Sequence, residues 1–512
     1  MARAGLLVIV VGAVLASACG GGTATAPPAG DSTAELPATP VATGANGDGD
    51  TDPGAEAEAG TDTPIADGYR DAAGRIIDAA MADDGAWQKL EHLTDSIGPR
   101  LSGSDNLERA VEWAEQAMLD DGHANVRTEL VMVPHWERGA ESGAIVAPAE
   151  HELSVLGLGG TVATPRRGIT AEVVVVDSFE ALAALPDDAV KGKIVLFNKP
   201  MPNFDPDHGA GYDVTVPYRS RGPVEAAKRG AVAAMVRSVT ANSLRTPHTG
   251  ATNYDDKVKK IPAVAVTTED ADLMARLAAK GETVKVKLVT SGKWKRDAKS
   301  ANVIAELPGR DAPEEIVVIG AHIDSWDVGQ GAHDDGTGCA IMMQALTVLK
   351  ELGLQPRRTI RVVLFTNEEN GLKGAIQYAT DHKDEIANHV AAIESDSGGF
   401  KPRGFEVQAG PGALAHMKDI GTLLDPIGAS RAVEGFGGAD LIPLSMSGVP
   451  ALGLWVDGST YFDIHHTAAD TLDKVDPEHL KMNVATVAVV AYVLADMPER
   501  LGAADASTRS SE

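Results

Sequence analysis

Cysteine is nearly absent from this chain of 512 residues, which contains only Cys19 and Cys339. Two cysteines cannot build a disulfide framework, but a chain of this length can bury a large core, in about two to four domains. Positive charge is also scarce, because 45 Lys and Arg residues stand against 73 Asp and Glu residues, for a net charge of −28. This negative field repels nucleic acid and anionic lipid, so we expect neither as a partner.

The apolar run at the N-terminus is too short to be retained as a membrane-spanning helix. Leu6–Leu15 follows Arg3 and precedes a small-residue segment that ends at Cys19, a pattern typical of a secretory signal. The order Leu-Ala-Ser-Ala-Cys resembles a bacterial lipobox, although such motifs more often have Leu where Ala16 stands. We therefore predict a lipoprotein signal peptide over residues 1–19, lipidation of Cys19 and attachment to the cell envelope. Simple cleavage, which would give a secreted protein, is the alternative.

Composition divides the rest of the chain into segments. Residues 20–67 are mainly Gly, Ala, Thr, Pro and acidic residues with little to bury, and they are predicted to be a disordered tether. We expect the N-terminal part of a catalytic domain over 68–142 and an inserted domain over 143–293. The catalytic domain then continues over 294–501, and 502–512 form a disordered tail.

Strand and helix patterns alternate in the last third of the chain. Apolar runs such as Ile316–His322 and Thr359–Thr366 are separated by helical patterns, and a final helix is expected near Leu480–Leu494. This alternation predicts an α/β fold with a mainly parallel or mixed central sheet and helices on both faces.

The segment 143–293 has a different character, with short strands and one helical stretch, Val224–Arg229. KGKIVLF (191–197) and RGAVAAMVRS (229–238) resemble the characteristic segments of a protease-associated domain. The alternative is an ordinary α/β half of the catalytic domain.

The stretch HIDSWDVGQGAHDDGTG, residues 322–338, is the strongest functional signal. A buried strand delivers His322 and Asp324 to its C-terminal end, which is where open α/β sheets bind ligands. Asp334 and Asp335 follow in a Gly-rich loop that opens a helix. An imidazole and several carboxylates at one place favour a metal site, although the two aspartates could equally form a turn and cap the helix.

Further candidate ligands each follow an apolar strand-like run or lie in a His-rich segment. Taken singly, a His at such a place is more often a hydrogen-bonded structural residue, and paired Glu residues are usually solvated. Their shared position at strand ends of one sheet favours a common site. These residues are Glu368, Glu369, Asp396 and His466.

A two-metal hydrolase needs a bridging carboxylate, terminal ligands on each ion and a separate base for the attacking water. Asp334 is the candidate bridge and Glu368 the candidate base. Asp324 points to the same face of its strand as His322, so it could accept the far imidazole N–H. One ion would be held by His322, Asp334 and Asp396, and the other by Asp334, Glu369 and His466.

The motifs HxDSW, GAxDDGxG, NEEN, ESDSG and HHxxxDT, in this order, resemble the co-catalytic dizinc exopeptidases over residues 69–500. The resemblance implies two Zn²⁺ per chain, with Co²⁺ or Mn²⁺ as possible substitutes, a peptide substrate, the roles given above and a possible homodimer. It also implies a cis peptide bond between Asp334 and Asp335. His465 stands where some relatives have a Tyr that contacts the tetrahedral intermediate, and its role stays open.

The resemblance is strongest to a branch of secreted dipeptidases, so we predict an exopeptidase of carboxypeptidase or dipeptidase type that acts on dipeptides or short peptides. Candidates for binding a terminal carboxylate are Tyr218, Arg219, Arg221, Arg237 and His248, unless these residues only hold the inserted domain together. Asp440 is a candidate for binding an ammonium group in an aminopeptidase, which is the main alternative. Two further alternatives are a non-catalytic binding lipoprotein of the same fold and a single-zinc acyltransferase. An intact set of ligands together with Glu368 disfavours the binding lipoprotein.

Overall fold

The computed structural model describes residues 64–205 and 209–502. The predicted signal peptide with Cys19, residues 20–63 of the predicted tether and the tail from 503 lie outside these ranges. The first helix, α2 (Pro64–Met81), begins before the predicted boundary at residue 68, so the prediction of a tether was wrong for 64–67. The reason is tertiary: Ala66 is fully buried, and the Ile65 N–H donates to Asp419 Oδ2 at 3.0 Å.

A mixed eight-stranded sheet forms the centre of the predicted catalytic domain, residues 68–142 and 294–501. The sequence predicted a mainly parallel or a mixed sheet, and the mixed sheet is correct. The strand order is β1-β12-β14-β13-β15-β18-β16-β17. β13 lies parallel to β14 and β15, whereas β1, β12 and β14 pair antiparallel. The strands are β1 (Ala124–Val133), β12 (Ala298–Leu307), β13 (Ala312–His322), β14 (Arg358–Phe365), β15 (His389–Glu394), β16 (Pro402–Gln408), β17 (Arg431–Glu434) and β18 (Ala451–Val456).

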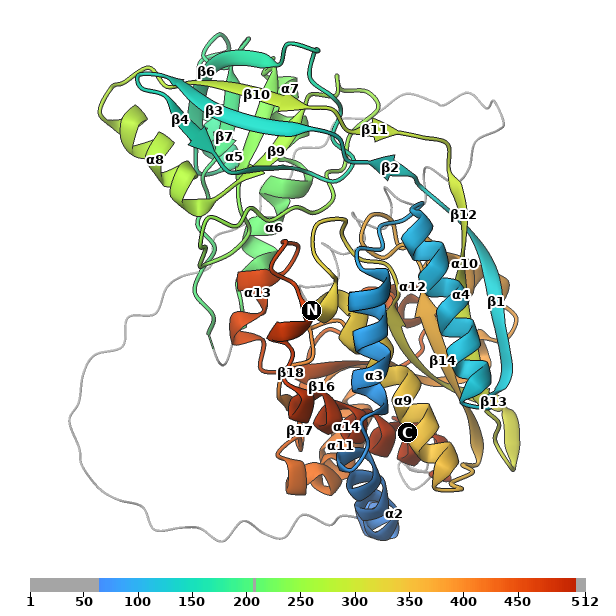
Figure 1. The fold of residues 1–512 in the computed structure, drawn as a ribbon. Coiled ribbons are helices and arrows are strands. Elements are labelled where there is room, and N and C mark those ends of the chain that lie inside the picture. Colours follow the sequence, from blue (N-terminus) through green and yellow to red (C-terminus); the bar gives the residue numbers. More distant parts are fainter. Residues whose placement is uncertain (1–63, 206–208, 503–512) are drawn as a thin grey trace, which may run out of the picture. The chain divides into compact units, whose positions relative to one another are not determined.

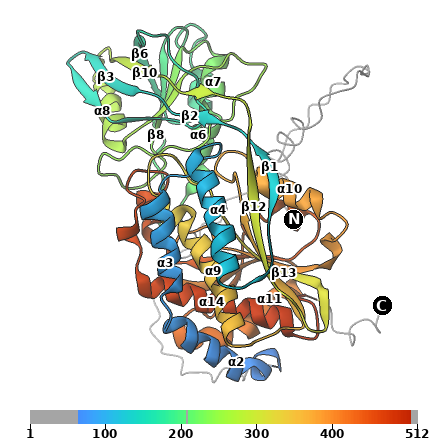
Figure 2. The ribbon, with the colours of Figure 1, turned by 45° about the vertical axis from the view of Figure 1, so that its right-hand side comes forward.

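Helices cover both faces of this sheet, because alternate side chains of its central strands enter different cores. In β13, Val317 and Ile319 pack into a core with α9 and α14, whereas Val318 packs with Tyr378 of α10 and Leu444 of α12. α4 runs along β1 and β12 (Figures 1 and 2). The helices are α3 (Gly85–Glu91), α4 (Asp105–Asp120), α9 (Thr337–Glu351), α10 (Lys373–Asp381), α11 (Pro411–Gly421), α12 (Ile442–Met446), α13 (Tyr461–Ile464) and α14 (Pro477–Asp496).

α14 is long and apolar enough to cross a membrane by length and composition, but 72% of its apolar window is buried inside the protein. It is therefore packed as a core helix. Short helical turns complete this part of the chain. They are η1 (His92–Ile97), η2 (Ala332–Gly336), η3 (Ile386–Asn388), η4 (Thr422–Ile427), η5 (Gly458–Thr460) and η6 (Leu472–Lys474).

Residues 141–290, here called the second lobe, form another eight-stranded sheet with a core on each face. Ile194 and Leu196 of β7 enter one core, and Val195 and Phe197 enter the other. The two-residue strands β2 (Trp136–Glu137) and β11 (Lys293–Trp294) pair where the chain enters and leaves this lobe. In the order β4-β3-β10-β6-β7-β8-β9-β5 the strands are β3 (Glu141–Ala147), β4 (His151–Leu153), β5 (Val155–Gly157), β6 (Ile169–Val176), β7 (Ile194–Phe197), β8 (Ala233–Arg237), β9 (Ala263–Val266) and β10 (Lys285–Thr290).

The prediction of a single helical stretch in this segment was wrong. α7 corresponds to the predicted stretch, but α6 contains Pro217 and buries only Thr215 and Arg219, so it has no apolar stripe to detect. α8 buries small or polar residues besides Met274, which weakens its periodicity in the same way. The helices are α5 (Phe179–Ala184), α6 (Tyr212–Ser220), α7 (Gly222–Lys228) and α8 (Thr268–Ala279).

Candidate active site

Two groups of three potential ligand atoms meet in the structure, and they share the carboxylate of Asp334. His322 Nε2 lies 3.2 Å from Asp334 Oδ1 and 3.2 Å from Asp396 Oδ1. His466 Nε2 lies 3.3 Å from Asp334 Oδ2 and 3.1 Å from Glu369 Oε2. The structure therefore brings all five predicted ligands together, with one oxygen of Asp334 in each group.

The spacing and chemistry of these atoms fit two zinc ions. Ligands bound at about 2.0–2.1 Å in a tetrahedral zinc site lie about 3.3 Å from one another, close to the observed distances. Asp334 Oδ2 is buried and accepts no hydrogen bond from the described residues, and an unsatisfied buried carboxylate oxygen is costly without a cation. Burial alone would lower the pKa of His322, yet Asp396 and Asp334 hold it well above its usual range, so the cluster favours positive charge.

Asp334 and Asp335 have different environments, which separates the two roles that the sequence left open. The peptide bond between them is cis, as the resemblance implied. Asp335 Oδ1 accepts the N–H of Gly338 at 3.0 Å, at the start of α9, and its Oδ2 accepts the N–H of His322 at 3.2 Å. Asp335 is thus the helix-capping residue, and Asp334 is the one that faces the candidate metal ligands.

Glu368 borders the same site without lying in either group of ligands. Burial raises the pKa of its carboxyl to about 8, and the carboxylates of Asp396, Asp324 and Asp334 add to the shift. A carboxylate with a raised pKa beside a metal centre is well suited to accept and return a proton. Bound cations would counteract part of this shift.

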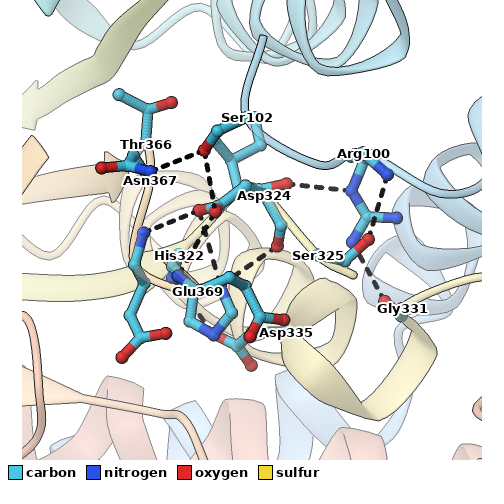
Figure 3. A network of polar contacts seen from close by, with 12 residues as sticks. Arg100, Ser102, His322, Asp324, Ser325, Gly331, Asp335, Thr366, Asn367 and Glu369 are labelled. Atoms are coloured by element: carbon cyan, nitrogen blue, oxygen red, sulfur yellow. Dashed lines mark hydrogen bonds and ion pairs between the residues drawn. The ribbon is translucent and has the colours of Figure 1, made fainter. Parts of the chain in front are cut away.

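Asp324 does not accept the far N–H of His322 as predicted. His322 Nδ1 lies 3.1 Å from the carbonyl oxygen of Asp324 and 3.8 Å from its carboxylate, so the backbone carbonyl takes this hydrogen bond. The carboxylate instead accepts the backbone N–H of Glu368 at 3.0 Å and that of Glu369 at 3.4 Å. Figure 3 shows Asp324 and Glu369 in this network. Asp324 therefore positions the segment that carries the base and a ligand. The alternation of side chains along the strand placed the Asp324 side chain on the correct face, but it could not show which N–H donor lies nearest to the carboxylate.

Arg100 and Ser102 support the same network from the loop before α4, and the sequence analysis did not identify them. Arg100 is fully buried and donates to the carbonyl oxygens of Gly98, Ile323 and Gln330. It also donates to the carbonyl oxygen of Gly331 (Figure 3). Ser102 Oγ lies 3.4 Å from Asp324 Oδ2 and accepts from Asn367 Nδ2 at 2.8 Å. An arginine inside a Gly/Pro/Ser loop was the only signal available for this role.

His466 is held by the second lobe. Its Nδ1 lies 3.3 Å from the carbonyl oxygen of Thr249 and 3.3 Å from Arg219 Nη1, and the Thr249 N–H donates to its carbonyl oxygen at 3.0 Å. A ligand that binds metal through Nε2 needs a proton on Nδ1, and the Thr249 carbonyl is the acceptor for that proton. His466 also has a positive φ of 59°, a conformation that these contacts stabilise.

His465 lies next to the same centre. Its ring stacks on that of His466 with centroids 3.6 Å apart, and its Nε2 is 3.7 Å from Asp334 Oδ2. Asp334, His465 and His466 thus form a second possible set of metal ligands. Glu369 Oε2 lies 3.1 Å from His466 Nε2. Both His465 and Glu369 thus adjoin His466, and Glu369 as the ligand in the second group stays a prediction.

A cavity of about 470 Å³ opens over the ligands. Its walls include aromatic side chains from both parts of the chain, among them Tyr212, Phe436, Trp455, Tyr461 and Phe462. Of the predicted substrate-binding residues in the described ranges, Arg219 and His465 line this cavity. Tyr218 does not line it and packs instead on Phe179 and Phe197. The remaining four, Arg221, Arg237, His248 and Asp440, do not line it either.

Those four residues have other surroundings. Arg221 is exposed, with its guanidinium 5.6 Å from the ring centroid of Phe179, and Arg237 pairs with Asp272 inside the second lobe. His248 is buried, and burial lowers its pKa to about 3. Asp440 is buried behind the cavity, where its N–H donates to Glu394 Oε1 at 3.2 Å.

Comparison with known proteins agrees with this geometry. Residues 302–491 match the family model described as Peptidase family M28. Carboxypeptidase Q of Mus musculus is 43% identical over 436 residues, which cover 85% of this chain and 91% of that protein. The chain belongs to peptidase family M28. This membership confirms the predicted class of enzyme, a zinc-dependent exopeptidase.

Solved structures support the same conclusion for the fold. The peptidase M28 precursor from Shewanella amazonensis superposes with a TM-score of 0.82 at 37% identity and covers 85% of this chain and 98% of its own. An aminopeptidase from Aneurinibacillus sp. strain AM-1 has a TM-score of 0.60 at 24% identity, with 84% and 97% covered. The second likeness shows that the fold is shared with aminopeptidases and does not decide which end of a peptide this M28 peptidase binds.

Proposed function

We propose that this M28 peptidase is a two-zinc exopeptidase of the carboxypeptidase or dipeptidase type. The observation that carries the proposal is the presence of two groups of candidate ligands that share Asp334. Glu368 lies beside these groups and belongs to neither of them. A binding protein of the same fold would have no use for a base at that position. A single-zinc acyltransferase would have no use for two complete groups of ligands.

Different residues of the site carry out different parts of the hydrolysis. Two zinc ions would supply Lewis acidity at the scissile carbonyl and lower the pKa of the attacking water. Glu368 accepts the proton of that water and transfers it to the leaving amine, so the proton count balances over one turnover. Asp324 keeps Glu368 and Glu369 in place through their backbone N–H groups.

Arg219 supports recognition of a terminal carboxylate. It is 7% exposed, lines the cavity and forms no ion pair with any carboxylate in the described ranges. A buried guanidinium without a partner anion is costly, and a substrate carboxylate would provide that anion in bidentate geometry. Asp440 is not among the residues that line the cavity, so the aminopeptidase alternative has less support than recognition of a carboxylate by Arg219.

We further propose that residues 143–293 are a protease-associated domain that contributes to the active site. Arg219 and Thr249 of this lobe both contact His466. Export with a lipid anchor at Cys19, and a homodimer, stay predictions from the sequence and the resemblance. The names of the relatives address neither.

The test is amino-acid release from dipeptides that are free, N-acetylated or C-amidated, by the purified chain with and without zinc. Glu368→Gln should lower kcat at least about 100-fold while zinc content is retained. Glu351→Gln, an exposed glutamate at the end of α9, is the matched control. Loss on C-amidation alone indicates a carboxypeptidase, loss on either block a strict dipeptidase, and loss on N-acetylation alone an aminopeptidase. No turnover by the zinc-loaded chain on any of these peptides would contradict the proposal.

A further inference from the structure

Tyr212, at the start of α6 in the second lobe, lines the cavity beside the ligand cluster. Its ring stacks on that of Phe462 with centroids 4.8 Å apart, and it meets the ring of His465 edge-on at 5.5 Å. His465 in turn lies 3.7 Å from Asp334. A continuous set of contacts thus places the phenol next to the reacting centre.

The hydroxyl of Tyr212 has one partner among the described residues, and that partner can only donate. Arg219 Nη2 donates to Tyr212 Oη at 2.8 Å. Because a guanidinium has no acceptor, the phenol oxygen is the acceptor in this hydrogen bond and its own proton remains available. The positive charge of Arg219 also polarises the O–H bond, which strengthens the phenol as a donor.

The position of Arg219 is fixed from several sides. Its Nη1 lies 3.4 Å from the Thr249 carbonyl oxygen and 3.3 Å from His466 Nδ1. Gly250 lies against the guanidinium so closely that a Cβ there would be 2.3 Å from Arg219 Cζ. The Thr249 carbonyl oxygen thus accepts from Arg219 Nη1 and lies within reach of the Nδ1 proton of His466, so the guanidinium is held beside Tyr212 and the phenol is preorganised.

We propose that the Tyr212 hydroxyl donates a hydrogen bond to the scissile carbonyl oxygen as negative charge develops on it, which makes Tyr212 a catalytic residue supplied by the second lobe. This inference rests on the proposed peptidase function. No bond to Tyr212 forms or breaks, and its proton stays on the phenol throughout. A donor that is already oriented costs no rearrangement when the charge appears, which is the general requirement for stabilising an oxyanion.

Two other cavity residues could supply the same hydrogen bond. Tyr461 packs against His465 at 5.0 Å between ring centroids. It has no cation to polarise its hydroxyl among its described contacts, so it is the weaker donor. His465 Nε2 lies 3.7 Å from Asp334 Oδ2, and its ring N–H is the other donor that the test must compare.

The test compares Tyr212→Phe, Tyr461→Phe and His465→Gln in the zinc-loaded full chain, on a dipeptide that the wild type cleaves. We expect Tyr212→Phe to lower kcat about 100-fold with KM changed less than about threefold. A phosphinic analogue of the dipeptide carries the tetrahedral geometry and the negative oxygens, so its inhibition constant should weaken by a similar factor. Binding of the product amino acids and zinc content should not change.

Tyr218→Phe is the matched control, because Tyr218 lies on the same helix but packs on Phe179 and Phe197 in the second-lobe core. Wild-type kcat in Tyr212→Phe, with a large loss in Tyr461→Phe or His465→Gln, would overturn this inference and leave the peptidase function intact. An inactive wild type would instead remove the proposed function on which the inference depends.

Discussion

Asp470 Oδ2 accepts the backbone N–H of Asp334 at 3.1 Å, and its other oxygen accepts the N–H of His333 at 2.8 Å. Asp470 lies four residues after His466 and is buried. One carboxylate therefore ties the segment carrying the bridging ligand to the segment carrying a terminal ligand of the second group. The sequence motif HHxxxDT contained this aspartate, but only the structure shows what it contacts.

Asp470→Asn should weaken zinc binding. The amide can accept only one of the two N–H groups and turns a donor toward the other, so Asp334 loses part of its support. We expect the zinc dissociation constant to rise about 10- to 100-fold, measured by competition with a chromogenic chelator. Asp473→Asn is the control, because Asp473 hydrogen-bonds only to exposed neighbours. An unchanged zinc affinity in Asp470→Asn would contradict the positioning role.

Arg100→Met should destabilise the fold rather than act on substrate binding. It leaves the buried carbonyl oxygens of Ile323, Gln330 and Gly331 without their donor. We expect a loss of about 3 kcal/mol in the free energy of unfolding, measured by urea denaturation. Arg109→Met, at an exposed site on α4, should stay within about 0.5 kcal/mol of wild type. Equal stabilities of the two variants would show that the buried network is not needed.

Gly250→Ala should disturb substrate binding through Arg219. The added Cβ would lie 2.3 Å from Arg219 Cζ, so the guanidinium must move away from the cavity wall. We expect KM for free dipeptides to rise about tenfold, the effect of losing about 1.4 kcal/mol. Gly281→Ala separates this effect from backbone strain, because Gly281 also has a positive φ but no atom within 4 Å of the added Cβ. KM should change only in the first variant.

His382 and Glu129 should make stability depend on pH. The hydrogen bond to Glu129 raises the pKa of His382, so the folded state binds this proton more tightly than the unfolded state. The contribution is complete below about pH 6.5, the ordinary pKa of His, and disappears as the pH rises through the raised value. We expect about 1 kcal/mol, measured as the difference in unfolding free energy between wild type and His382→Gln from pH 5 to 9. A difference that stays constant over this range would rule out the pair as its source.

The amino-acid sequence alone was sufficient for the class of fold and for choosing the five candidate ligands and the candidate base, whose roles stay predictions. His322, Glu369 and Asp396 each come shortly after an apolar run, and strand period and sheet topology bring such positions to one end of a sheet. His322 and Asp334 could thus be placed without coordinates. The strands at the two edges of the sheet, β1 and β17, were not predicted, because their exposed or mixed patterns resemble loops.

Contacts between segments far apart in the chain could be decided only by the tertiary structure. Arg219 lies 247 residues before His466 and Arg100 lies 223 residues before Ile323, and no local pattern reports such pairs. The same limit applies to hydrogen-bond partners: the far N–H of His322 goes to a carbonyl rather than to the Asp324 carboxylate by a difference of less than an ångström. Residue type and period determine which side chains can meet, whereas packing of the whole chain determines which atoms do.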